Sequence, residues 1–248
     1  MTERSARVKQ IGAVVAGLAI GASAMALAQS KQPAAADPQR SAMEQVVRNY
    51  ILDHPEIIPE AMTRLRSREE ATQVASNRRA LETPFAGAWA GAAKPDVTLV
   101  EFFDYNCGYC RASMPDIDRL LKDDKGLRIV FRELPILSPQ SEVAARVSLS
   151  AAKQNRFYGF HHALYAAGRP GQAELAKVGK AAGLDPAAVA KDMKAADVQR
   201  ELDGNIELAR ALGVSGTPSF VVGDRILTGA VGYDALRNAV AEARAKRG

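Results

Sequence analysis

The chain has 248 residues, a formal net charge of +5 and 47% hydrophobic residues. This length provides one well-buried core and a smaller appendage, and the modest charge argues against a nucleic-acid partner or strong binding to a membrane surface. The two cysteines, Cys107 and Cys110, lie only three positions apart. A disulfide closing so short a loop removes little entropy from the unfolded chain, so the pair is a poor structural staple.

Residues 1–28 have the layout of a secretory signal. Three basic residues precede an uncharged apolar run over 11–28, which ends in a small-x-small pattern. The alternative is a permanent membrane anchor, because eighteen apolar residues could nearly span a bilayer. We expect cleavage after Ala28 and export to the periplasm, where disulfides persist.

A flexible leader is expected over 29–40, and a pair of helices over 41–65. Apolar residues recur at helical spacing within each helix. Ser41 is the expected N-cap of the first helix. That helix should end just before Pro55, and the second should begin near this proline.

The apolar face of this helical pair is too small to close on itself. The next stretch, 66–83, is charged and helical, with Val74 and Leu81 as its large aliphatic residues. A polar helix of this kind is typical of a segment that crosses solvent. We therefore interpret 41–65 as an oligomerisation segment and 66–83 as a linker that holds it away from the main domain. The alternative is packing of the apolar face onto the chain's own main domain.

The main domain is expected to begin at residue 84. The nearly continuous apolar run Val97–Phe103 predicts a buried strand. A helix follows over 111–122, and Leu127–Arg132 predicts the next strand. This strand–helix–strand order implies a parallel sheet with a crossover helix.

Residues 139–212 show five helical patterns and no strand pattern. Strand character then returns, followed by a two-residue turn, a second strand and a closing helix, over 219–222, 223–224, 225–227 and 233–245. We therefore expect an α/β fold formed by 84–138 and 213–248, with 139–212 as an inserted helical domain and an N-terminal helical extension.

The Cys107-Gly108-Tyr109-Cys110 stretch is either a redox dithiol or half of a metal site. It follows a strand and opens a helix, where free N–H groups and the helix dipole favour a thiolate at Cys107. Cys110 lies one turn further in and should be more buried. We expect Cys107 to attack disulfides and Cys110 to resolve the mixed disulfide, with Gly108 and Tyr109 beside the substrate and influencing the redox balance.

A metal site would need further ligands. Two thiolates form half of a tetrahedral site. His54 belongs to the N-terminal helices, and the neighbours His161 and His162 point about 100° apart on a helix. We expect ordinary surface or packed histidines, no metal and no cofactor. Because soft thiolates suit Cu(I), a Cu(I)-binding or holdase protein is kept as an alternative to an enzyme.

Two more positions bear on the dithiol. Glu101 lies in an otherwise apolar strand. Its carboxylate either faces water or is buried beneath the dithiol, where a raised pKa would let it relay a proton when Cys110 attacks. Pro218 leads directly into a strand, so it marks a turn, and a cis Thr217–Pro218 bond is one option there.

The stretches Phe102–Cys110 and Val214–Phe220 together resemble the DsbA-like branch of the thioredoxin superfamily over residues 84–246. The resemblance implies a thioredoxin fold with an inserted helical domain. It implies that Cys107 is the exposed nucleophile and that Glu101 is the buried acid of the site.

The same resemblance implies a cis bond between Thr217 and Pro218, in a loop that pairs with the extended chain of the substrate. Tyr50–Ile58, joined by a charged helix to such a domain, is similar to the suppressor-of-copper-sensitivity C proteins. In at least some of these proteins the N-terminal helices build an oligomer that shuffles wrong disulfides.

Together these features predict an exported thiol–disulfide oxidoreductase that acts as an oligomeric disulfide isomerase, with a trimer as one possible form. Its expected partners are cysteine-containing exported proteins and a membrane redox partner that resets the dithiol. A monomer-type dithiol oxidase is the alternative enzyme.

Overall fold

The structure, a computed structural model, describes residues 38–246. The signal predicted over 1–28 lies outside the described residues, as does the leader predicted over 29–40 except for its last three positions. The chain divides between Ala61 and Met62 into two units. Among the helices within 38–246, none is long and apolar enough to cross a membrane.

Two helices open the described chain, α2 (Pro38–Asp53) and α3 (Ile57–Glu82). α2 begins three residues before Ser41, so the expectation that Ser41 caps it is wrong; proline suits the first turn instead. It ends at Asp53, as expected from the restriction that Pro55 places on the residue before it. α3 begins at Ile57, and the predicted division between residues 65 and 66 falls inside this continuous helix.

The apolar side chains of α2 are open to solvent. No residue of this helix is buried, and Ile51 is half-buried. Its other large apolar side chains are 51–70% exposed: Met43, Val46, Val47, Tyr50 and Leu52. A contiguous exposed apolar surface is rare on a soluble monomer and marks an interaction site.

The C-terminal half of α3 is packed on the sheet of the main unit. Val74 and Leu81 are each 1% exposed and join a buried cluster with sheet residues. Arg78 pairs with Asp224 at 2.7 Å. The expectation that the whole of 66–83 is a solvent-crossing linker is therefore wrong for this half. Its two large aliphatic residues lie seven positions apart on one face of the helix, and their burial is sufficient to dock it on the sheet.

Arg132 holds the end of α3. Its side chain is 6% exposed, and its guanidinium donates to the carbonyl oxygens of Ala80, Leu81 and Thr83 and to the Glu201 carboxylate, the last at 2.8 Å. It thus satisfies carbonyl groups that a helix C-terminus leaves without partners.

Replacing Arg132 with methionine is expected to lower the free energy of unfolding by about 3–5 kcal/mol, because Glu201 and the helix carbonyls would lose a buried cationic partner. Urea denaturation measures the loss. Replacing Arg210, an exposed residue of the helix that carries Glu201, should cost less than about 0.5 kcal/mol. An equal, small loss in both variants would contradict this role.

The sheet has five strands in the order β1-β3-β2-β4-β5. The strands are β1 (Trp89–Gly91), β2 (Val97–Phe103), β3 (Leu127–Glu133), β4 (Ser219–Val222) and β5 (Arg225–Thr228). β2 and β3 are parallel, as predicted, and the other neighbouring pairs are antiparallel. The two-residue turn at Gly223-Asp224 is also confirmed, with φ of 59° at Gly223. β1 was not predicted.

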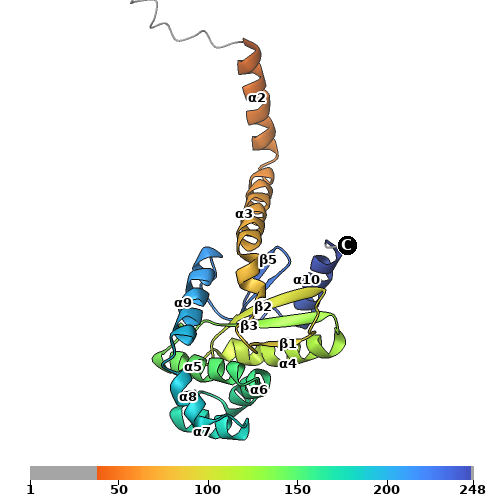
Figure 1. Cartoon of the computed structure of the whole chain (residues 1–248). Helices are drawn as coiled ribbons and strands as arrows, with labels where there is room; N and C mark the ends of the chain where they lie inside the picture. The colour runs from red at the N-terminus through yellow and green to blue at the C-terminus, as the bar shows by residue number, and fades with distance from the viewer. Residues whose placement is uncertain (1–37, 247–248) are drawn as a thin grey trace, which may run out of the picture. The chain divides into compact units, whose positions relative to one another are not determined.

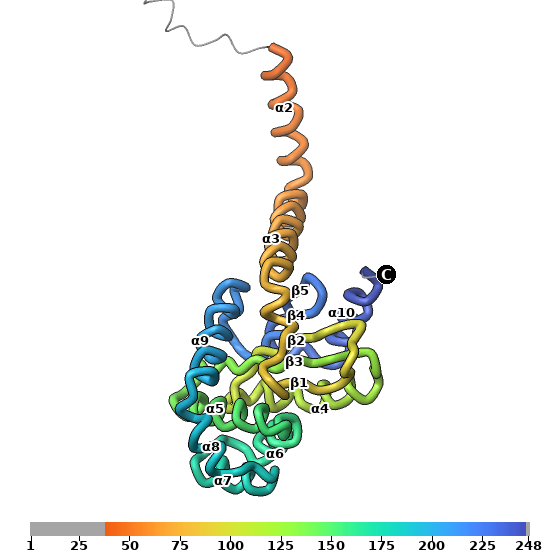
Figure 2. The backbone as a smooth tube through the Cα atoms, in the orientation of Figure 1, coloured from red at the N-terminus to blue at the C-terminus, as the bar shows by residue number. Residues whose placement is uncertain are grey.

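Five helices separate β3 from β4, as the sequence predicted, and Figure 2 shows the path of the backbone through them. The helices of this unit after α3 are α4 (Gly108–Asp123), α5 (Pro139–Lys153), α6 (Phe157–Ala167), α7 (Gln172–Ala181), α8 (Pro186–Asp192), α9 (Ala196–Ala211) and α10 (Tyr233–Ala245). Figure 1 shows α5 to α8 gathered at one end, away from α10.

Each face of the sheet carries a buried cluster. Leu99, Phe103 and Phe131 belong to the larger cluster, together with residues of α4, α6 and α10. Val100 and Phe102 belong to the smaller one, together with residues of α3 and α9. Because both faces are covered, β2 is buried along its whole length, which explains its continuous apolar sequence.

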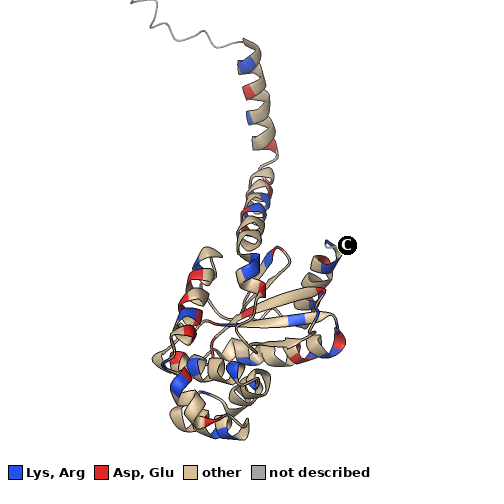
Figure 3. Ribbon diagram, in the orientation of Figure 1, with Lys and Arg blue, Asp and Glu red and all other residues tan. Residues whose placement is uncertain are grey.

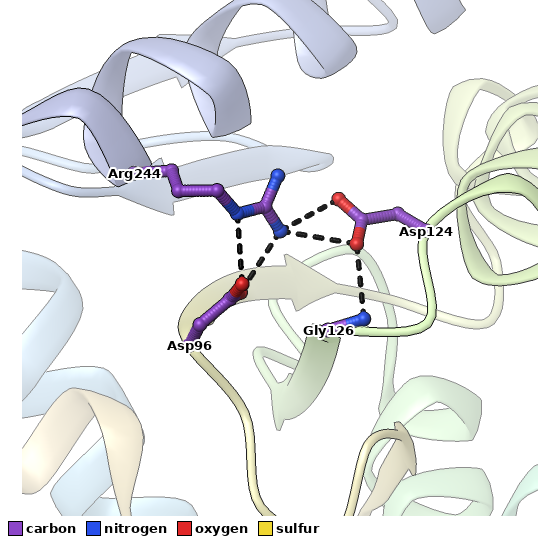
Figure 4. Close-up of polar contacts among 4 residues, drawn as sticks. All are labelled: Asp96, Asp124, Gly126 and Arg244. Carbon is purple, nitrogen blue, oxygen red and sulfur yellow. Dashed lines mark hydrogen bonds and ion pairs between the residues drawn. The ribbon is translucent and has the colours of Figure 1, made fainter.

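An ion-pair cluster fastens α10 to the rest of the unit. Figure 4 shows the Arg244 guanidinium between Asp96, which precedes β2, and Asp124, which follows α4; the N–O distances are 2.8–3.0 Å. Asp124 also accepts a hydrogen bond from the Gly126 N–H at 3.0 Å. The pairing raises the pKa of Arg244 and lowers that of Asp96. Elsewhere in the unit the two signs of charge are interspersed (Figure 3).

Candidate functional site

The dithiol lies where β2 passes into α4. Cys107 is the N-cap of α4, with φ −79° and ψ 115°. Its sulfur accepts a hydrogen bond from the backbone N–H of Cys110 at 3.4 Å. An N-cap side chain receives the free N–H groups of the first turn, so negative charge on this sulfur is stabilised by the helix. Both cysteines are free thiols in this structure.

Access to the two sulfurs differs from the expectation. The resemblance implied that Cys107 is exposed, but the residue is only 5% exposed. Cys110 is more buried, at 0%, so the predicted difference between the two cysteines is small. Tyr109 between them is 71% exposed. A Cβ atom built on Gly108 would meet no atom within 4 Å, so this side of the motif is open. A substrate can therefore approach over the Gly108-Tyr109 dipeptide.

The loop before β4 covers Cys107 from the other side. The Thr217–Pro218 bond is cis, as the resemblance implied. The Cys107 thiol donates to the Thr217 carbonyl oxygen at 3.1 Å. The loop is anchored at both ends, because Ser219 Oγ donates to the Gly216 carbonyl at 2.8 Å and the Gly229 N–H donates to the Pro218 carbonyl at 2.8 Å. Residues 110 positions apart in sequence thus meet at the nucleophilic sulfur.

Glu101 lies buried beneath the dithiol. It is 1% exposed, which excludes the water-facing alternative. Burial, and then the charge of a Cys107 thiolate, hold the pKa of Glu101 well above its usual range. Burial also raises the pKa of Cys110, and the Glu101 carboxylate raises it further. A buried thiol next to a carboxyl group with a raised pKa can exchange a proton with it.

Asp104 and Asn106, which sequence reasoning missed, brace the loop before Cys107. Asp104 accepts hydrogen bonds from the backbone N–H of Asn106 at 2.7 Å and of Leu137 at 3.0 Å. The Asn106 amide donates to Ser138 Oγ at 2.8 Å and to Ser141 Oγ at 3.0 Å. The signal was the pair of Asx residues directly after a strand, because such side chains bond nearby backbone groups in turns.

A buried polar cluster, also missed, extends from the same loop. The Tyr105 hydroxyl lies 2.8 Å from Ser148 Oγ and 3.0 Å from His161 Nδ1. Burial lowers the pKa of His161 to about 3, so its ring is neutral. Glu133, at the end of β3, is 1% exposed, and a hydrogen bond with Ser148 acts to lower its pKa. No spacing in the sequence links these residues, which come from four separate elements.

The histidines are distributed as expected. His161 is packed among aromatic rings, whereas His162 is exposed and pairs with Asp118 at 3.0 Å. His54 stacks on Tyr50 with ring centroids 4.6 Å apart. Across residues 38–246, no group of three or more His, Cys, Asp or Glu side chains is placed to hold a metal ion.

Two family models match the chain. The DSBA-like thioredoxin domain matches residues 98–241, which is more than half of the chain, and includes the dithiol, Glu101 and the cis-proline loop. The N-terminal domain of the copper resistance protein ScsC matches residues 39–72. The chain therefore belongs to the DsbA-like thioredoxin family, whose fold and helical insertion it shows. Its N-terminal segment is of the ScsC type.

Solved structures agree with this assignment. A linker-deletion mutant of Proteus mirabilis ScsC is 30% identical, with a TM-score of 0.69, and the match covers 87% of this chain and 100% of that one. A thioredoxin-like oxidoreductase from Silicibacter pomeroyi is 39% identical, with a TM-score of 0.62, and the match covers 66% and 95%. The fold and the close cysteine pair are those of DsbA-like thiol–disulfide oxidoreductases.

Among curated proteins, the chain is similar to Na⁺/H⁺ antiporter NhaA 1 of Salinispora arenicola, with 33% identity over 160 residues. This match covers 62% of the present chain and 24% of the antiporter. The chain thus spans about a quarter of the length of the curated relatives it matches.

Proposed function

We propose that this protein is an exported disulfide isomerase, in which an oligomer presents several Cys107 nucleophiles to one substrate protein. The observation that carries the dithiol chemistry is the position of the Cys107 sulfur at the start of α4, against the Thr217 carbonyl. The first feature stabilises a thiolate, and the second places the attacking sulfur beside backbone groups that can pair with a substrate chain.

The reaction begins with attack of the Cys107 thiolate on a substrate disulfide. A mixed disulfide forms at Cys107, and one substrate sulfur leaves as a thiolate. In isomerisation this thiolate attacks another disulfide of the substrate, and a later substrate thiolate displaces Cys107. The enzyme dithiol is regenerated and no electrons are gained or lost.

Cys110 provides a second route by which the mixed disulfide is resolved. Its thiol transfers a proton to the Glu101 carboxylate, and its sulfur then attacks Cys107, releasing the substrate as a thiolate. The substrate is reduced by two electrons and the enzyme is left as the Cys107–Cys110 disulfide. A membrane dithiol partner would then return two electrons to it. Burial of both Cys110 and Glu101 supports this proton transfer.

Two exposed surfaces support the choice of substrate and assembly. Tyr109, Ile136 and Leu137 are exposed apolar residues, and Leu137 is hydrogen-bonded to the loop that precedes Cys107. Apolar surface at this position suits incompletely folded proteins, which expose their own apolar segments. The exposed face of α2 and the ScsC-type match over 39–72 support association through the N-terminal helices. Cleavage after Ala28 and a periplasmic location complete the proposal.

Two parallel assays test it. In the first, the reduced protein is given a substrate with scrambled disulfides; in the second, the oxidised protein is given the same substrate fully reduced. We expect rapid recovery of native substrate in the first assay. Rapid oxidation in the second assay without recovery in the first would establish the dithiol oxidase instead.

A further inference from the structure

Glu101 and Glu133 occupy the same face of the sheet. In the parallel pairing of β2 with β3, Glu101 lies opposite Phe131 and Phe103 lies opposite Glu133. Residues two apart on a strand share a face, and directly paired residues point the same way. Both carboxyl groups therefore point into the buried cluster that contains Phe103 and Phe131 and both cysteines. They are diagonal neighbours on the dithiol side of the sheet.

The surroundings of Glu133 oppose its ionisation. It is 1% exposed, and its Oε1 atom has no hydrogen-bond partner among residues 38–246. The adjacent residue, Arg132, points to the opposite face, where it binds Glu201 and α3. Burial raises the pKa of Glu133 well above its usual range. A hydrogen bond with Ser148 lowers it in part, and the charges of Asp104, Glu201 and Glu101 raise it further.

The buried tyrosines and the buried histidine of this region are neutral. Burial raises the pKa values of Tyr105, from the loop before Cys107, and of Tyr165, from α6. It lowers that of His161 to about 3. From α4, the Cys110 thiol is also buried. The charges that vary with the redox state are therefore those of Cys107 and the two glutamates.

The hydrogen bonds around Tyr105 permit two arrangements. With Glu133 protonated, hydrogens run from Glu133 to Ser148, then to Tyr105, and then to His161 Nδ1, which accepts. With Glu133 ionised, each bond reverses, and His161 Nδ1 carries the hydrogen. A hydroxyl both donates and accepts, so each arrangement satisfies the same contacts at 2.8 and 3.0 Å.

We propose that Glu133 is a positioning residue for the dithiol: it holds a second proton whose retention depends, through Glu101, on the redox state of Cys107. Ser148, Tyr105 and His161 form the hydrogen-bond chain that accommodates either protonation state. This proposal rests on the proposed redox function of Cys107 and Cys110, and extends it to a residue that does not touch them.

The proton balance follows from the charges. Reduction of the Cys107–Cys110 disulfide by a dithiol adds two electrons and leaves a Cys107 thiolate and a Cys110 thiol, with one proton taken up at Cys110. The new thiolate raises the pKa of Glu101. Glu101 then holds its proton more tightly, so reduction takes up an additional fraction of a proton there. A protonated Glu101 no longer raises the pKa of Glu133, so Glu133 releases its proton more readily in the reduced protein.

The test is the equilibrium constant with glutathione, measured across neutral pH for four proteins: wild type, Glu133→Gln, Glu101→Gln and the double variant. Each extra proton taken up on reduction changes this constant by about tenfold per pH unit. We expect Glu133→Gln to make the pH dependence shallower in the wild-type background and to have no further effect in Glu101→Gln. Equal changes in both backgrounds, or no change in either, would overturn the proposal. Glu142→Gln, at an exposed carboxylate of α5, should behave as wild type.

A second measurement needs no variant. Nitrogen NMR of His161 in the wild-type protein reports which ring nitrogen carries the hydrogen. We expect the Nε2–H form to be lost at lower pH in the reduced protein than in the oxidised one, because a protonated Glu101 no longer raises the pKa of Glu133. The same tautomer profile in both redox states would refute the coupling. Neither measurement uses isomerase activity. A protein that fails the scrambled-substrate assay but shows these shifts would lose the isomerase proposal and keep this one.

Discussion

Replacing Cys107 with serine is expected to abolish disulfide reduction and isomerisation, with a loss of at least about a thousandfold. A serine hydroxyl at this site remains protonated and is a weak nucleophile, whereas the cysteine thiolate is the species that attacks disulfides. Cys110 cannot replace it, because its sulfur is buried and burial raises its pKa. Rates with a small disulfide and with a protein substrate measure the loss.

The matched variant is Cys110→Ser. It retains the attacking sulfur, so mixed disulfides should form at the normal rate and then persist, since the resolving thiol is absent. Reduction of a small disulfide should fall, whereas part of the isomerase activity, which can proceed by substrate displacement, should remain. Equal residual activity in the two single variants would contradict the division of roles between Cys107 and Cys110.

Charge placed on the exposed face of α2 is expected to dissociate the oligomer. In Val46→Glu/Tyr50→Glu, two exposed apolar residues become acidic, and an interface formed by that face would bury unpaired charges. Light scattering should then give the mass of a single chain. Isomerase activity should fall at least about tenfold, because one substrate would meet one dithiol at a time, while reduction of a small disulfide is unchanged.

The control is Gln45→Glu, which adds charge to the same helix at a polar position. It should keep the mass of the wild type. These substitutions are preferable to deletion of the whole segment up to Glu82, because Val74 and Leu81 belong to the core of the main unit. A wild-type protein that is already a single chain in solution would refute the oligomer proposal.

The sequence predicted the parts of the fold that depend on strong local patterns. Val97–Phe103 and Leu127–Arg132 are continuous apolar runs, and both are strands of the parallel pair. The helical patterns of 139–212 are also long enough to be recognised. β1 escaped prediction because Trp89–Gly91 contains three residues, one of them glycine, and its pairing with β3 depends on a neighbour distant in sequence.

The error over 66–83 has a physical cause. Composition shows how polar a helix is on average, but docking depends on where its few apolar residues point. Val74 and Leu81 lie seven positions apart, two turns along one face of α3, and the buried Arg132 adds contacts that no property of the helix itself indicates. The polar composition of 66–83 predicted that this segment is exposed to solvent. Contacts with residues of the main unit determine where its C-terminal half lies.

The candidate site shows the same limit. The cysteine pair, Glu101 and the Thr217–Pro218 turn were predictable because each breaks the local pattern around it. Glu133 was not, because a charged residue at the end of a strand usually faces solvent. Its burial results from α5 and α6, which cover this end of the sheet and bring Ser148 and His161 to it. Residues that acquire their surroundings from an inserted domain leave no short-range signal.

The central claim is that Cys107 forms a covalent bond with misfolded substrate proteins. The most direct measurement is mass spectrometry of Cys110→Ser after incubation with a substrate whose disulfides are scrambled. We predict a mixed disulfide that joins the substrate to Cys107 and is released by a reducing agent. Recovery of the protein with a free Cys107 thiol and no substrate adduct would contradict it.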